Sequence, residues 1–428
     1  MSDERLSRLD RAHVVHPHQV VGQAPEPLVI ASGKGAVITD VDGNEYLDGT
    51  CGLWQCLVGH GREELAEVAA GQMRTLEFYA SFWDYSNRPA IELAERLAQI
   101  SPPGLDHVFF TNGGSEGTET AIKLARLAWS SAGRPDRNVI LSRKMAYHGV
   151  GYGSLSATGI PPLKEGFGPL ADGFVHLTAP YPLRVPDCTN TCIAELEETI
   201  ERLGADRIAA MIGEPVLGVA GMIPPPDDYW PRVAEVLGRH GILLILDEIV
   251  TAYGRTGSWF AAQRWGGIPA DLIVTAKGLT SGYLPMGAVL IGDRVMELLD
   301  GTRFSHGFTY NGHPTCAAVA LRNLEIIERE GLLARAVEMG DRLLAALREA
   351  EGLPAVAEVR GVGLMAGVEL EDPADGAELA ARIRSRGAIV RATGQKLVLS
   401  PPLVIEPEQV DRLAEIIVSE LAATTVPA

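Results

Sequence analysis

The chain has 428 residues, 46% of them hydrophobic, and can therefore bury a large core and form two or three domains. Its formal net charge of -18 repels nucleic acids and anionic membrane surfaces, so we expect neither as a partner. No apolar run reaches the roughly 20 residues of a transmembrane helix, and the opening MSDERLSRLDR is too charged for a signal peptide. These features predict a cytoplasmic protein.

The five cysteines form an odd-numbered set in a long chain, which favours reduced thiols over a disulfide framework. Cys188 and Cys192 are close enough in sequence to share a metal ion. No cluster of histidines or further cysteines accompanies them, so we expect a surface loop and no metal.

The first regular element in the chain is a β-hairpin at residues 36–48, where apolar and polar residues alternate about an Asp-Gly turn. From about residue 87 to 300, helical patterns alternate with short apolar runs. These runs are HVFF, NVIL, AAMIG, GILLILD and DLIVTA. The alternation predicts an α/β fold with a mostly parallel sheet covered by helices.

The C-terminal part has a different pattern, with a long helix after residue 315, strand-like segments, and a closing helix around 410–421. It predicts a smaller α+β domain. The early hairpin has no sheet of its own, so we expect it to pack there. The predicted units are therefore an N-terminal segment (1–60), a large domain (61–314) and a small domain (315–428).

Two polar residues follow buried strands, where α/β sheets bind their ligands. Asp247 ends the run GILLILD, and Lys277 follows DLIVTA. Burial lowers the pKa of a lysine toward a nucleophilic amine, although a strand-end lysine often reaches solvent instead. Asp247 alone could cap a turn or pair with Arg255. Together they supply what pyridoxal phosphate (PLP) needs, a carboxylate for its pyridine nitrogen and an amine for its aldehyde.

A glycine-rich turn, Asn112 to Ser115, opens a helix and offers backbone N–H groups to a phosphate. The same stretch also fits the G-x-S-x-G elbow of serine hydrolases. In that alternative Ser115 is the nucleophile and His306 or His313 the base, but the sequence has no HGGG-type oxyanion segment. A non-catalytic binding protein on a similar fold is a further alternative.

Six segments in order resemble the class III aminotransferases of PLP fold type I, over nearly the whole chain. They are FFTNGGSEGTETAIKLAR, YHG at 147–149, GEPV at 213–216, LDEIVTAYGRTG, TAKGLTSGYLPMGAV and HGFTYNGHPTCAA. The resemblance implies that Lys277 holds PLP in a Schiff base and moves the substrate proton. It also implies that Asp247 pairs with the pyridine nitrogen, while Tyr147 and Ile249 cover opposite faces of the ring.

The resemblance assigns further contacts around the cofactor. Glu214 would lie near the ring oxygen, and Gly114 and Ser115 would bind the phosphate. Thr309 matches a position that reaches the phosphate of the neighbouring subunit, which implies a homodimer with shared active sites. One departure is Gly117, where the family usually has alanine, and we expect it to loosen that helical turn slightly.

A second departure concerns the substrate. Glutamate-dependent members of the family carry a glutamate and an arginine where this chain has Val219 and Val398. The chain therefore more closely resembles the ω-amino acid:pyruvate and amine:pyruvate transaminases. Their substrate pocket matches Trp54 and the aromatic pair Phe82 and Trp83.

Arg391 matches the mobile arginine of that subgroup, which can meet a carboxylate or swing away. The resemblance thus implies a ping-pong transaminase that takes an amino group from an ω-amino acid or amine and passes it to pyruvate or a related keto acid. Aminomutase, racemase and decarboxylase activities remain open, because they would use the same lysine. The sequence does not identify the donor.

Overall fold

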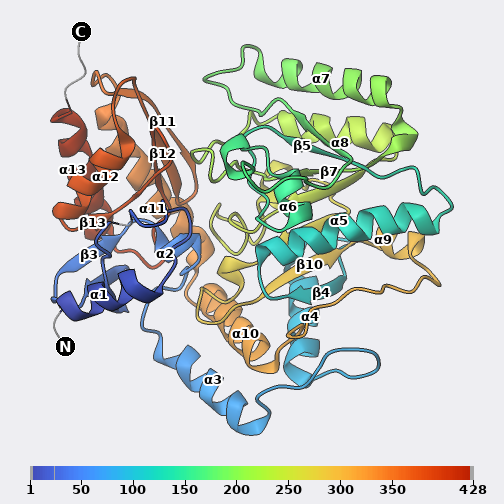
Figure 1. Cartoon of the computed structure of the whole chain (residues 1–428), viewed down its shortest axis with the longest axis horizontal. Helices are drawn as coiled ribbons and strands as arrows, with labels where there is room; N and C mark the ends of the chain where they lie inside the picture. The colour runs from blue at the N-terminus through green and yellow to red at the C-terminus, as the bar shows by residue number, and fades with distance from the viewer. Residues whose placement is uncertain (1–2, 24, 425–428) are drawn as a thin grey trace.

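The computed structural model describes residues 3–23 and 25–424 and contains a large and a small unit (Figure 1). The large unit is built on a seven-stranded sheet of order β4-β10-β9-β8-β7-β5-β6, in which the neighbours from β9 to β6 are parallel. Its strands are β4 (His107–Thr111), β5 (Val139–Arg143), β6 (Phe174–Leu177), β7 (Ile208–Gly213), β8 (Leu243–Asp247), β9 (Leu272–Thr275) and β10 (Gly287–Ile291). The mostly parallel sheet predicted from the sequence is confirmed.

Strand β10 is antiparallel to both of its neighbours, β4 and β9, and was not predicted. Nor was β6, a short strand in which His176 interrupts the apolar pattern. The five other strands coincide with the predicted apolar runs, because strands buried on both faces have nearly continuous hydrophobic sequences.

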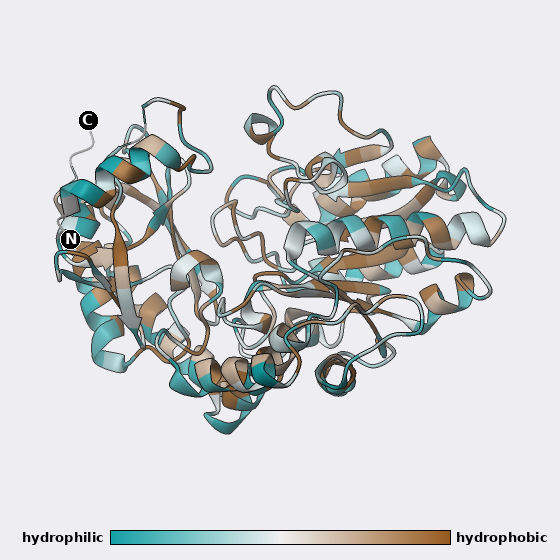
Figure 2. Ribbon diagram, turned by 60° about the horizontal axis from the view of Figure 1, so that its bottom comes forward, coloured by the Kyte–Doolittle hydropathy of each residue, from teal (hydrophilic) through white to brown (hydrophobic). Residues whose placement is uncertain are grey.

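Helices cover both faces of this sheet, and alternate residues of each strand point to opposite faces. On β9, Leu272 and Val274 pack with the helix α5, whereas Ile273 belongs to the hydrophobic cluster on the other face. In Figure 2 the strands are largely brown, and more teal appears on the helices outside them. The helices of this unit are α3 (Glu63–Thr75), α4 (Arg88–Ile100), α5 (Gly114–Ser131), α6 (Tyr152–Ala157), α7 (Cys188–Leu203), α8 (Tyr229–Arg239), α9 (Asp293–Leu298) and α10 (Pro314–Arg329).

The small unit combines the two ends of the chain, shown in dark blue and red in Figure 1. Its two sheets have the orders β1-β2-β3-β13 and β11-β12-β15-β14, and β3 of the early hairpin pairs in parallel with β13. The strands are β1 (Ile30–Lys34), β2 (Val37–Asp40), β3 (Glu45–Asp48), β11 (Val356–Val362), β12 (Met365–Leu370), β13 (Ala388–Ile389), β14 (Arg391–Ala392) and β15 (Lys396–Leu399). The helices are α1 (Asp3–His13), α2 (Cys51–Trp54), α11 (Leu332–Leu347), α12 (Gly376–Ser385) and α13 (Pro407–Ala422).

The N- and C-terminal parts thus form the smaller α+β unit, as the sequence predicts. The exact boundaries at residues 60 and 314 remain a prediction. Within the two described ranges, the chain has no helix that is both long and apolar enough to cross a membrane.

One local expectation needs correction, and another residue gains a packing role. Cys188 and Cys192 do not lie on a surface loop, since both are buried on α7, where residues four apart face the same side. Gly117 has a packing role that the helix propensity does not reveal. A Cβ at Gly117 would come within 2.7 Å of Val274 Cγ1, so the glycine lets α5 lie close to β9.

Candidate active site

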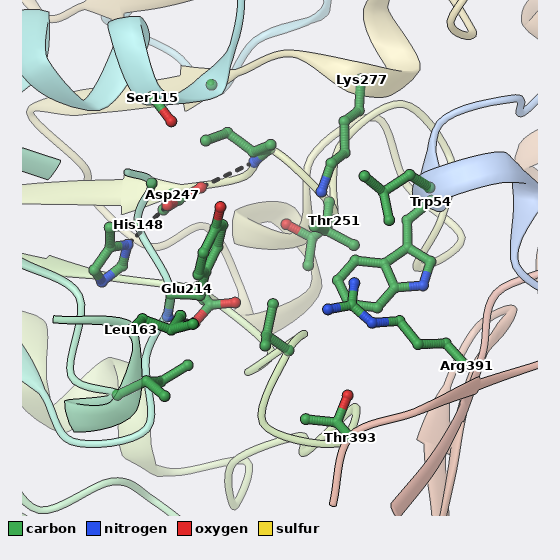
Figure 3. Close-up of a pocket in the computed structure, with 18 of the residues that line it drawn as sticks. Trp54, Ser115, His148, Leu163, Glu214, Asp247, Thr251, Lys277, Arg391 and Thr393 are labelled. Atoms are coloured by element: carbon green, nitrogen blue, oxygen red, sulfur yellow. Dashed lines mark hydrogen bonds and ion pairs between the residues drawn. The ribbon is translucent and has the colours of Figure 1, made fainter. Parts of the chain in front are cut away.

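A cavity of about 710 Å³ lies at the carboxyl ends of β7, β8 and β9 (Figure 3). The small unit contributes Trp54, Arg391 and Thr393 to its wall. A volume of a few hundred cubic ångströms suits a cofactor with a small substrate. This is the sheet edge at which parallel α/β folds place their ligands.

Lys277 follows the end of β9 and points into the cavity (Figure 3). Its φ of 39° lies in the left-handed region, which a non-glycine residue adopts at an energetic cost. Burial lowers the pKa of its amine to about 8. The nearby carboxylates of Asp247 and Glu214 act in the opposite direction and raise this pKa, but by less. Since its Nζ makes no hydrogen bond or ion pair with the described residues, the amine is available as a nucleophile.

Asp247 ends β8, and its Oδ2 lies 2.7 Å from Nδ1 of His148. Both side chains are buried. With the carboxylate as acceptor, the donor of this hydrogen bond is Nδ1 of His148. The second oxygen of Asp247 accepts a 3.2 Å hydrogen bond from the backbone N–H of Ile249.

His148 has no assigned role in the sequence prediction, although it lies in the YHG segment. Its contact with Asp247 joins residues 99 positions apart, which no local pattern shows. A buried strand-end carboxylate does require a partner, and that requirement was the available signal. The imidazole holds Asp247 in place and supports its negative charge.

Glu214 follows β7 and ties two loops together. Its Oε1 accepts a hydrogen bond from the N–H of Tyr147 at 3.0 Å, and its Oε2 accepts one from the N–H of Gly218 at 2.9 Å. Burial raises the pKa of Glu214 and also that of the Tyr147 phenol. The tyrosine ring is therefore held in the cavity in its neutral form.

The first turn of α5 lies at the same cavity and offers the backbone N–H groups of a helix N-terminus. Gly114 packs against Ile249 so closely that a Cβ there would come within 2.7 Å of the isoleucine Cδ1. Ser115 Oγ accepts a hydrogen bond from the N–H of Val150 at 3.2 Å. The turn that the sequence predicts to bind the phosphate thus lies beside Ile249, the residue predicted to cover one face of the cofactor ring.

Trp54 and Arg391 form the cavity wall that belongs to the small unit. The Trp54 side chain is buried, and the guanidinium carbon of Arg391 lies 4.9 Å from the centroid of its ring (Figure 3). Lys277 Nζ lies 5.0 Å from the same centroid. Among the described residues no carboxylate is within ion-pair distance of Arg391, so the guanidinium can donate hydrogen bonds to the carboxylate of a substrate.

Phe82 and Thr309 do not line the cavity of their own chain. Phe82 packs against Gly307, since a Cβ on that glycine would come within 2.8 Å of its ring. Thr309 is exposed two residues further on. The structure thus brings these two predicted site residues near each other but away from Lys277.

The geometry gives no support to a serine hydrolase in the part of the chain that is described. His306 contacts Thr120 at 2.9 Å and Lys123 at 3.0 Å, and not Ser115. His313 accepts a hydrogen bond from the N–H of Thr315 at the start of α10. Neither of these two histidines is positioned to take a proton from the Ser115 hydroxyl.

The side chains at the cavity fit PLP group by group. Lys277 supplies a free amine, Asp247 a buried carboxylate supported by His148, and the start of α5 a site for a phosphate. Tyr147 and Ile249 provide an aromatic and an aliphatic surface for a flat ring. Fold and site together define a PLP-dependent enzyme of fold type I.

Comparison with known proteins defines the family. The model of the class III aminotransferases matches residues 19–421. Putrescine–pyruvate aminotransferase of Pseudomonas aeruginosa is 40% identical, over 95% of this chain and 93% of the relative. The chain therefore belongs to the class III aminotransferases, and it is a PLP-dependent transaminase.

Solved structures agree with this assignment. An (S)-enantioselective omega-transaminase from Thermomicrobium roseum superposes with a TM-score of 0.96 at 46% identity, covering 99% of both chains. An amine transaminase from an uncultivated Pseudomonas species, described as PLP-bound, gives 0.90 at 40% identity and covers 96% of this chain and 98% of its own.

Proposed function

We propose that the enzyme transfers the amino group of an amine or ω-amino acid to pyruvate in two half-reactions of a ping-pong mechanism. The observation that carries this proposal is the position of Arg391, an unpaired guanidinium stacked on Trp54 near the free amine of Lys277. A donor that lacks a carboxylate leaves this arginine stacked. A keto acid, in contrast, can bind it through its carboxylate.

Each polar group of the cavity then has a distinct task. Bound PLP supplies the electron sink of the reaction. Lys277 binds the cofactor, and its amine takes the proton from the substrate carbon and returns it. Asp247, supported by His148, keeps the pyridine nitrogen protonated.

The remaining contacts hold the cofactor in place. Tyr147 and Ile249 cover its two faces, and Glu214 lies near the ring oxygen. Gly114 and Ser115 bind the phosphate. The support for these assignments is that all five residues line the same cavity as Lys277.

The cavity favours a donor without a second ammonium group. Its walls include a set of apolar side chains: Leu53, Ile160, Leu163, Val216, Val219 and Val250. Both carboxylates of the cavity already have hydrogen-bond partners. Asp247 contacts the His148 ring, and Glu214 accepts hydrogen bonds from two backbone N–H groups. A second ammonium group on the donor would therefore find no free carboxylate among the described residues.

A donor screen that measures alanine formed from pyruvate tests the proposed function. We expect amines with an apolar body to be faster than diamines, and pyruvate to be faster than 2-oxoglutarate. Donor-dependent alanine formation also separates transamination from aminomutase, racemase and decarboxylase reactions. No alanine from any donor, with turnover supported by another keto acid, would refute pyruvate as the acceptor.

We predict that Arg391→Ala slows the keto acid half-reaction selectively. Loss of a charged contact to the pyruvate carboxylate should cost about 2–4 kcal/mol, or roughly 30- to 1,000-fold in pyruvate efficiency. Reaction with an amine that lacks a carboxylate should change little. Stopped-flow absorbance of the cofactor measures each half separately.

Arg386→Ala is the matched control, because Arg386 lies on the same unit and pairs with Glu420 at the surface. It should leave both half-reactions unchanged. Equal slowing of both halves by Arg391→Ala would indicate a structural role for Arg391.

We also propose a homodimer in which Thr309 and Phe82 complete the site of the partner subunit. In support, both lie away from the cavity of their own chain, on neighbouring loops that expose large aromatic side chains. These exposed residues are Tyr79, Trp83, Tyr85 and Tyr310. Aromatic groups of this kind are typical of interfaces.

Thr309→Ala should weaken PLP retention while leaving the fold intact. Removing a hydrogen bond to a charged phosphate predicts about a 10- to 100-fold increase in the dissociation constant of the cofactor. Cofactor release during dialysis measures the change, with Thr302→Ala on the same segment as the control. A fully active monomer in sedimentation would contradict the shared site.

The five free, buried cysteines support a reducing compartment, and we propose the cytoplasm as the place of action.

A further inference from the structure

The turn that carries Trp54 has a strained backbone. Cys51, Gly52 and Trp54 have φ angles of 53°, 67° and 62°, so three residues of α2 occupy the left-handed region. Two of them are not glycine, and such residues rarely adopt this conformation. It persists only where surrounding contacts impose it. Contacts outside the turn must therefore hold Trp54 in its position.

The carboxylate of Asp48 provides part of these contacts, beside the apolar cluster in which the Trp54 ring packs. Its side chain is almost fully buried. Oδ1 accepts hydrogen bonds from the backbone N–H and the hydroxyl of Thr50, at 3.0 and 2.8 Å, and Oδ2 accepts one from the N–H of Gly52 at 2.7 Å. An ionised acceptor makes such bonds stronger, so the charge of Asp48 closes the turn.

His60 is the hydrogen-bonded counter-charge of Asp48, and the buried guanidinium of Arg255 is a second, non-bonded one. Its Nε2 lies 2.9 Å from Oδ2 of Asp48, and its Nδ1 lies 3.5 Å from Sγ of Cys56. The hydrogen bond to Asp48, with a smaller effect of Cys56, raises the pKa of His60 to about 10. Burial raises the pKa of Asp48, but the hydrogen bonds led by that of His60 outweigh this effect and lower it overall. Both groups are therefore charged at neutral pH.

The backbone of His60 is fixed from the other side by the N-terminal sheet. Its N–H donates to the carbonyl of Gly35 at 2.9 Å, and its carbonyl accepts from the N–H of Gly35 at 3.0 Å. The two hydrogen bonds to Gly35 thus fix the backbone that carries the imidazole, whereas the turn that the imidazole supports is strained. A change at His60 should consequently move the turn and not the sheet.

We propose that His60, acting through Asp48, is a positioning residue for Trp54 and thereby sets the selectivity of the enzyme for its amine donor. This inference rests on the proposed function. His60 itself does not line the cavity, but the Trp54 ring that it positions lies against both Lys277 and Arg391 (Figure 3). Without the counter-charge, Asp48 holds the turn less firmly and the indole leaves the wall, which opens space for bulkier donors.

Two variants and one control test the proposal in the PLP-bound enzyme. His60→Phe keeps a ring but removes both the hydrogen bond and the charge, and His60→Gln keeps an N–H donor without the charge. His107→Gln is the control, because His107 lies exposed near Asp293, at 3.8 Å, on β4. All variants are first compared with the wild type by thermal unfolding.

The first readout is alkylation of the native enzyme by N-ethylmaleimide, mapped by mass spectrometry. Cys51 lies in the turn and Cys56 two residues after it, and both are buried, so the wild type and the control should remain unlabelled at both. His60→Phe should become labelled at one or both, and His60→Gln to a smaller extent. This measurement reports the turn without depending on catalysis.

The second readout is the ratio of kcat/KM for a bulky and a small amine. His60→Phe should shift this ratio by about ten- to a hundredfold in favour of the bulky amine, the range expected for a misplaced positioning group. The kcat with the small amine should stay within a few-fold of wild type, and His60→Gln should lie between the two.

If folded His60→Phe lacks the new cysteine labelling, or lacks the shift in the kcat/KM ratio, the proposal is overturned. If that variant does not fold, His60→Gln decides, and wild-type labelling together with a wild-type ratio would overturn it equally. If the wild-type enzyme transfers no amino group from any amine, the proposed function fails, whereas the labelling still shows whether His60 holds the turn.

Discussion

Lys277→Ala should lower kcat/KM by at least about 10⁴-fold, because it removes both the group that binds the cofactor and the base that moves the proton. The pKa of about 8 makes the amine of Lys277 partly neutral at physiological pH, as both tasks require. No other described lysine lines the cavity. Steady-state alanine formation from a fast donor and pyruvate measures the loss.

Lys164→Ala is the matched control. Burial lowers the pKa of this lysine too, but it lies in a separate surface hollow with Lys144 and His176. It should retain activity close to wild type. Activity of Lys277→Ala within tenfold of wild type would show that another group performs the proton transfer.

Asp247→Asn should slow the amine half-reaction by on the order of 10²- to 10³-fold, since it leaves the pyridine nitrogen without its negative partner. The loss should lie in proton abstraction from the donor. A donor deuterated at the reacting carbon should therefore show a larger isotope effect in the variant than in the wild type. Single-turnover absorbance measures both rates.

Asp271→Asn provides the comparison, because Asp271 is also largely buried at the sheet but lies at the far end of β9 from Lys277. Its Oδ2 accepts a hydrogen bond from the N–H of Leu244 at 2.8 Å, so its replacement tests a structural effect alone. If Asp247→Asn stayed within a few-fold of wild type, the role assigned to Asp247 would be wrong.

The sequence predicted the parallel strands and the polar residues at their ends, because both follow from local rules. A strand buried on both faces must be apolar throughout, and ligands bind at its carboxyl end. Asp247 and Lys277 therefore stood out. Strand β10 was missed although its residues are apolar, and its antiparallel pairing with β4 joins segments that are distant in sequence.

The contacts between distant segments of the chain could not be predicted from the sequence. The pairing of His148 with Asp247 and the stacking of Arg391 on Trp54 join distant segments, and only the folded chain brings them together. The strained turn of Trp54 likewise depends on His60 and Asp48. Sequence resemblance named Trp54 and Arg391, but it did not show what holds them.

Phe82 and Thr309 mark a different limit. Their proposed roles depend on a second copy of the chain, and a single chain places both outside its own cavity. The tests of Thr309 therefore address a contact between two subunits, which neither the sequence nor the structure of one subunit contains.

Borohydride reduction of the wild-type enzyme, followed by proteolysis and mass spectrometry, tests most directly whether Lys277 binds PLP. Reduction converts a cofactor bound to a lysine into a stable pyridoxyl group that survives digestion. We expect this group on the peptide that contains Lys277 and on no other peptide. A pyridoxyl group on a different lysine, or no label on an enzyme that is fully active, would contradict the central assignment.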